Sequence, residues 1–271
     1  MSMRLDQARA VADAVLFDGR LLYPQLASSN HDQLGVLGPE GAEDAGFGQS
    51  STMSMQCLLT SSSDLVMHLR FLQAQHRVAN GTSWLTWDEA VERERTFELS
   101  PFDLEDGGTV LSVAVEGGEE DDPDDRGEGR VVRRRWPLTA EMRAAIVPSD
   151  GCIRLDISVL NLHTGCTDAD DATRHSLIGT HVIIEALDAD FVSLLKPPDR
   201  LAAQAAACSQ HRFWPVLGGE AGVTDLLLGL PIILRDHPQI GAVAEHPLES
   251  AESAWPGLAD IRDVERGPSG R

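Results

Sequence analysis

The sequence predicts a mainly β protein of the α+β class, an antiparallel β-sandwich or barrel-like pair of sheets with a few short helices. Several short segments alternate apolar and polar residues, turn residues separate them, and strands do not alternate with long helices. The chain has 271 residues, of which 42% are hydrophobic. That composition is sufficient for a buried core.

The first third of the chain predicts one helix, a long polar loop and two strands. Residues 5–17 carry apolar side chains at helical spacing, with Asp6 in the first turn. Residues 27–56 contain few large apolar side chains and predict a loop with a brief strand at 34–37. Strand patterns follow at 57–61 and, more clearly, at 65–74, where leucine, methionine and phenylalanine occupy every second position.

The middle of the chain is dominated by charge. Residues 83–96 suit a helix by charge content and a strand by their tryptophans, so both remain open. Residues 116–128 hold eight carboxylates and one arginine, which predicts a mobile, solvated surface loop. The arginine-rich residues 130–138 predict an extended segment that faces this acidic loop.

The remaining segments predict further strands and two short helical stretches. A helical turn is predicted at 172–177, and a helix at 201–209 from its alanines. The predicted strands are residues 109–116, 151–162, 181–187, 191–195, 213–217 and 226–234.

The domain prediction is a single β-rich domain over residues 1–240, with a sub-boundary indicated near 139–150. Residues 241–271 are rich in proline, alanine and glutamate and predict an irregular tail.

Charge excludes two classes of partner. The formal net charge is −21 and the isoelectric point is about 4.6. Such a chain repels phosphate backbones and anionic lipid surfaces, so we expect neither nucleic acid binding nor membrane insertion. No apolar run approaches the roughly 18 residues that span a bilayer. Aspartates interrupt the apolar residues at the N-terminus, a pattern that does not fit a signal peptide. The expected location is the cytoplasm.

One cluster has the composition of a metal site. His163 and Cys166 follow a predicted strand, and His175 and His181 come soon after. Imidazole and thiolate are ligands for Zn, Ni or Fe. Their spacing matches no standard zinc motif, so an ordinary polar loop with a thiol is the competing interpretation.

The sequence contains no motif of a known catalytic centre. The serine-nucleophile pattern G-x-S-x-G, the zinc-protease pattern H-E-x-x-H and a phosphate-binding loop are all absent. We therefore identify no catalytic and no cofactor-binding residues. Residues 213–217 and 231–238 instead carry bulky apolar side chains next to turn residues, which suggests either core strands with capping turns or a docking edge for a protein partner. Trp214, Asp236 and His237 in these segments are the candidate partner-binding residues.

A series of short segments is spread across most of the chain in a recognisable order. The segments are VADAVLFDG (11–19), LLYP (21–24), ASS (27–29), WDEAVERE (87–94), FVSLLKPP (191–198), WPVL (214–217) and PIILRDHP (231–238). In sequence and in order they resemble an uncharacterised bacterial family whose members are encoded beside actinobacterial-type, high-affinity nickel–iron hydrogenases. The resemblance implies an accessory or maturation role and adds Tyr23 to the candidate partner-binding residues.

These observations favour a non-enzymatic accessory or maturation protein that binds partner proteins, either hydrogenase subunits or other maturation factors. Two alternatives remain. One is a protein that binds or delivers a metal through the His/Cys cluster. The other is an enzyme of unknown class, which a deep pocket with convergent polar groups would favour.

Overall fold

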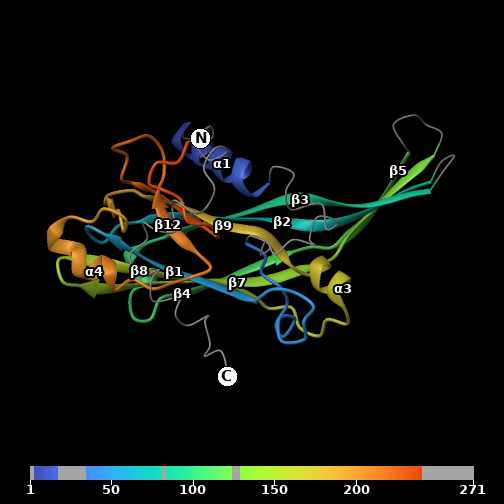
Figure 1. Cartoon of the computed structure of the whole chain (residues 1–271), viewed down its shortest axis with the longest axis horizontal. Helices are drawn as coiled ribbons and strands as arrows, with labels where there is room; N and C mark the ends of the chain where they lie inside the picture. The colour runs from blue at the N-terminus through green and yellow to red at the C-terminus, as the bar shows by residue number, and fades with distance from the viewer. Residues whose placement is uncertain (1–2, 18–34, 81–83, 124–128, 240–271) are drawn as a thin grey trace, which may run out of the picture.

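Two antiparallel β-sheets stack face to face and confirm the predicted mainly β fold (Figure 1). This computed structural model describes residues 3–17, 35–80, 84–123 and 129–239. The first sheet has the order β10-β1-β8-β7-β4, with β11 also paired to β1. Its strands are β1 (Thr52–Leu59), β4 (Thr109–Val115), β7 (Leu138–Ser149), β8 (Cys152–Asn161), β10 (Phe191–Val192) and β11 (Gln210–His211).

The second sheet has the order β12-β13-β9-β2-β6-β5, and β3 pairs with the other side of β2. Its strands are β2 (Leu65–Asn80), β3 (Trp84–Leu99), β5 (Gly118–Pro123), β6 (Arg130–Arg135), β9 (Leu177–Ala186), β12 (Trp214–Leu217) and β13 (Leu226–Leu230). The β2–β3 hairpin is paired along the full 16 residues of each strand.

Period-two alternation places the main core between the sheets. Met53, Met55 and Ile157 from the first sheet meet Leu69 and Phe71 from the second, and all five side chains are buried. Burying such side chains contributes roughly 1.5–3 kcal/mol each relative to leaving them in water. The alternation seen in residues 65–71 therefore marks the face of β2 that packs in the sandwich.

Helices are few and short, as predicted. They are α1 (Met3–Leu16), α2 (Pro101–Leu104), α3 (Ala169–Arg174), the 3-10 helix η2 (Asp199–Leu201) and α4 (Ala202–Ala206). Helix α1 buries Leu5, Ala8 and Val11 in a second core cluster with outward-facing side chains of β9 and β13, including Ile183 and Leu228. It thus covers the outer face of the second sheet.

One prediction for the charged middle of the chain needs correction. Within the acidic block predicted as a loop, residues 118–123 form strand β5, because every backbone position pairs with β6. Arginines of β6 also neutralise the carboxylates: Arg130 pairs with Asp121 at 2.7 Å and Arg133 with Asp122 at 3.2 Å. The arginines do face the acidic block, as predicted. Residues 124–128 lie outside the described residues.

Residues 83–96, for which the sequence left both helix and strand open, belong from Trp84 onward to strand β3. One strand boundary differs from the sequence prediction. Strand β1 begins at Thr52, inside the predicted long loop, of which residues 27–34 lie outside the described residues. Strand β7 occupies the stretch where a sub-boundary was indicated, and it pairs with β4 on one side and β8 on the other. The predicted tail, residues 241–271, lies outside the described residues.

Candidate functional site

Three of the four predicted metal ligands lie near one another, around Asp171. The rings of His163 and His175 stack with centroids 3.8 Å apart and an angle of 4° between their planes. Nδ1 of His175 lies 2.9 Å from the backbone oxygen of Asp171 and 3.3 Å from its carboxylate. Burial raises the pKa of the Cys166 thiol, and the charges of Asp171 and Asp168 raise it further. A thiol held protonated in this way is a weaker metal ligand.

His181 lies elsewhere. Its ring is fully buried, makes an edge-on contact with Phe17 after α1, and has Nε2 3.2 Å from Nη1 of Arg70. The four predicted ligands therefore do not form one site. Across the described part of the chain, no group of three or more His, Cys, Asp or Glu side chains is arranged to hold a metal ion. This corrects the four-ligand grouping read from the sequence.

The predicted partner-binding residues have structural contacts where they are described. Asp236 accepts hydrogen bonds from the Ser193 hydroxyl and from the backbone N–H of Leu217 at 2.9 Å. The N–H of His237 donates to the oxygen of Leu217 at 2.7 Å, which holds this segment against β12. Trp214 packs against the second core cluster. Tyr23 lies outside the described residues, and partner binding by all four stays a prediction.

A buried ionic network ties α1 to the second sheet, and the sequence did not indicate it. Arg70 of β2 is 5% exposed, and its guanidinium lies 2.7 Å from Asp13 of α1 and 3.1 Å from Glu94 of β3. Arg9 of α1 reaches the same Glu94 carboxylate at 2.5 Å. Burial alone would raise the pKa of Glu94, but the hydrogen bond and charge of Arg9 lower it below its ordinary value.

His181 makes the stability of this region dependent on pH. Burial lowers the pKa of His181 from 6.5 to about 3, against the smaller raising effect of its bond to the Gly179 oxygen. The neutral ring donates from Nδ1 to that oxygen and accepts from Arg70 at Nε2. Since the unfolded chain takes up the proton below its own pKa, stability is full above pH 6.5 and is lost as the pH falls toward 3.

We expect the free energy of unfolding to be about 2 kcal/mol lower at pH 5 than at pH 7 because of His181 alone. Urea titrations of the wild type and of His181→Gln at both pH values measure it. The variant removes the titrating group, so its loss of stability between pH 7 and 5 is expected to be smaller by that amount. An equal loss in both proteins would contradict the assignment.

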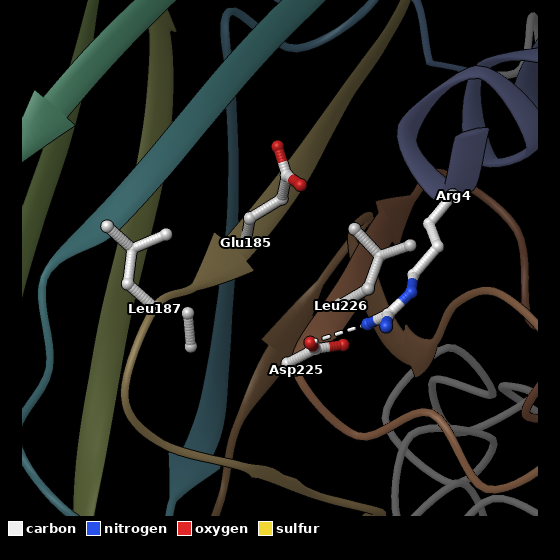
Figure 2. Close-up of a pocket in the computed structure, with 6 residues that line it drawn as sticks. Arg4, Glu185, Leu187, Asp225 and Leu226 are labelled. Carbon is white, nitrogen blue, oxygen red and sulfur yellow. Dashed lines mark hydrogen bonds and ion pairs between the residues drawn. The ribbon is translucent and has the colours of Figure 1, made fainter. Parts of the chain in front are cut away.

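The pocket in Figure 2 lies beside the N-terminal end of α1 and the ends of β9 and β13. It has a volume of about 200 Å³, and Arg4, Glu185 and Asp225 line it. Two of these lining residues are joined, since Arg4 donates to Asp225 at 2.7 Å. A second recess of about 230 Å³ lies on the outer face of the first sheet, lined by residues such as Ser54, Arg143 and Asp156. Both are smaller than the roughly 300–1,000 Å³ of typical small-molecule sites.

The most distinctive feature is a projection that we call the arm. It consists of the distal halves of β2 and β3 with β5 and β6, and it extends well beyond the sandwich (Figure 1). Its strand order is β3-β2-β6-β5. Among the described strands, β3 pairs only with β2, and β5 pairs only with β6. Both sides of the arm therefore end in strands with an unpaired edge, where backbone N–H and C=O groups are available.

No protein-family model and no curated protein sequence matches this chain. The described helices include none with the length and apolar character required to cross a membrane.

Proposed function

We propose that this protein is a non-enzymatic accessory protein that binds partner proteins through the arm. The supporting observation is the projection of paired strands from the sandwich with an unpaired strand edge on each side. An exposed strand edge can take an additional strand from another chain through main-chain hydrogen bonds. Charged side chains along β3 and β5 restrict such pairing to partners with a complementary arrangement of charge.

We further propose that the partner is a subunit of a nickel–iron hydrogenase or another of its maturation factors, in the cytoplasm. The motif series described above supports this proposal. One of the resembling segments, WDEAVERE, lies within β3. Since β3 pairs with β2 and forms one unpaired edge of the arm, this segment links the resemblance to the proposed binding surface.

A shortened arm tests the proposal. Residues 76–88 and residues 119–134 are each replaced by Asn-Gly, which joins the paired positions Gln75 with Glu89 and Gly118 with Arg135 by two-residue turns and removes most of the arm. Tagged wild-type protein, expressed in a host with the neighbouring hydrogenase genes, is expected to retain a hydrogenase subunit or maturation factor. The shortened variant is expected to bind it about tenfold more weakly or worse.

The matched control is Phe102→Ala, which removes an 85% exposed aromatic side chain from α2 in the body. This variant is expected to bind like the wild type. Normal hydrogenase activity and normal metal content in a strain that lacks the gene would refute the hydrogenase link. Equal partner retention by wild-type and shortened proteins would refute the role of the arm.

A further inference from the structure

The inner face of the second sheet changes character where the sheet leaves the sandwich. Along β2 this face carries Leu69 and Phe71 within the core and then Gln73, Gln75 and Arg77. Along β3 the same face carries Phe97 next to the core and then Arg95 and Arg93. At the base of the arm this face carries polar side chains that are covered to different extents, since Gln73 and Gln75 are buried whereas Arg93 and Arg95 are half-buried.

Two buried glutamines hold two of the arginines in place. Nε of Arg93 donates to the Gln73 side-chain oxygen at 2.9 Å, and Nη1 of Arg135 donates to the Gln75 oxygen at 2.9 Å. The amide nitrogen of Gln73 donates in turn to the backbone oxygens of Trp136 and Glu116, at 2.6 and 3.2 Å. Both glutamines are buried, so their amide orientations are fixed by these bonds.

Arg95, which like Arg93 lies on the edge strand β3, completes a cluster of three arginines with Arg93 and Arg135. It donates from Nη1 to the backbone oxygen of Glu94 and from Nη2 to that of Ala114, both at 3.0 Å. Gln73 and Gln75 lie two positions apart on one face of a strand, which corresponds to about 6.6 Å. The guanidinium groups that they hold therefore lie side by side.

These hydrogen bonds leave positive charge uncompensated. The inner face of the arm carries five arginines and three carboxylates, namely Arg77, Arg93, Arg95, Arg133 and Arg135 with Glu89, Glu120 and Asp122. The carboxylates form ion pairs with Arg77, Arg133 and Arg135. Within the described residues, Arg93 and Arg95 have only neutral acceptors, an amide oxygen and backbone carbonyls.

The pKa of Arg93 reflects this arrangement. Burial lowers it, and the positive charges of Arg135 and Arg95 lower it further, against a smaller raising effect of Glu120. An arrangement that brings like charges together and partly removes them from water costs free energy in the absence of an anion. A bound anion would remove that cost.

We infer that Arg93, Arg95 and Arg135 form a binding site for an oxyanion, a carboxylate or phosphate group. Guanidinium groups recognise both through paired, charge-assisted hydrogen bonds. Arg93 donates to Gln73 through Nε, and among the described residues its two terminal nitrogens have no hydrogen-bond partner, so they are available to a ligand. Among the described residues, Glu120 is the one carboxylate paired with these three arginines. Its side chain is half exposed, so a ligand can displace it from Arg135. This site does not depend on the proposed protein partner.

Titration of the full chain with inorganic phosphate and, separately, with citrate tests the inference. The Arg93 Nε–H resonance in a ¹⁵N NMR spectrum at low ionic strength is expected to shift in a saturable way with at least one of the two. Saturation by phosphate alone assigns a phosphate ligand, and saturation by citrate alone assigns a carboxylate. No saturable shift with either anion at millimolar concentration would overturn the inference.

A pair of variants separates this site from general charge. Arg93→Gln combined with Arg95→Gln is expected to weaken anion binding about tenfold or more, measured by calorimetry. The control combines Arg143→Gln with Arg4→Gln, two exposed arginines outside the arm, and removes the same charge. The control is expected to bind as the wild type does. Equal weakening in both variants would overturn the inference, and thermal unfolding of each variant establishes that it is folded.

Discussion

Replacing Arg70 by alanine is expected to lower the free energy of unfolding by about 3 kcal/mol, which makes it one of the two largest effects predicted for this chain. Arg70 is nearly inaccessible to solvent and joins Asp13 of α1 to Glu94 of β3. It also supplies the hydrogen bond to Nε2 of His181. Truncation leaves carboxylates close together with their guanidinium removed, which is more costly than the loss of a surface ion pair.

The estimate lies at the lower end of the range for buried pairs because the carboxylates retain contact with water. The side chains of Asp13 and Glu94 are 36% and 29% exposed. Arg9 also remains on Glu94 and compensates part of its charge. The effect should therefore be largest at the α1 end of the network, where Asp13 loses the ion pair that joins it to the sheet.

Arg4→Ala is the matched control, since Arg4 also connects α1 to the body. Its pair with Asp225 is solvent-exposed, at 57% and 44%, and such pairs contribute about 0–1 kcal/mol. Urea denaturation followed by circular dichroism measures both variants. Should the two substitutions lower stability equally, the buried network would not be what holds α1 on the sheet.

Sequence patterns predicted the strands whose two faces differ in polarity. In residues 65–71 and 153–159, one face is apolar because it packs in the sandwich and the other is polar or half-buried. Strand β9 illustrates the limit of this method. Nearly all of its side chains are buried, since the core lies on one face and α1 on the other. The sequence therefore could not show that His181 faces α1 and Arg70, away from His163 and His175.

The strands of the arm were harder to predict, because they carry charged side chains at positions where the usual strand pattern has apolar ones. Residues 92–95 read Glu-Arg-Glu-Arg, which alternates with period two, but the alternation is in sign of charge and not in hydrophobicity. Likewise, the acidic residues of β5 are in a strand because they pair with β6, whose arginines neutralise them. The proximity of the two blocks, acidic then basic, was the one signal available in the sequence.

The arginine cluster depends on strand register, which the sequence does not specify. Gln73, Arg93 and Arg135 lie on three strands, and they meet only because β3 and β6 pair with opposite sides of β2 in the observed register. A shift of one residue would turn each of these side chains to the other face. The inner face of the arm is thus set by the core residues that fix the register of β2.

Phe71 is the last large core residue of β2 before the arm, and Phe71→Ala is expected to cost about 3–5 kcal/mol of stability. The ring is 0% exposed between the sheets, so truncation leaves a cavity that a rigid pair of sheets can fill only in part. The loss of packing should also disturb the arginine cluster, because Phe71 precedes Gln73 on the same face of β2 and Arg93 lies opposite Phe71 on β3.

Chemical denaturation, with hydrogen exchange of the β2 amides in parallel, measures both consequences. Phe102→Ala removes the same side chain from an 85% exposed position and is expected to change stability by less than about 0.5 kcal/mol. In Phe71→Ala, protection of the β2 amides should fall together with global stability, and anion-dependent shifts of Arg93 should weaken. If stability falls while the Arg93 response is unchanged, the register of the arm is held by its own ion pairs and not by the core.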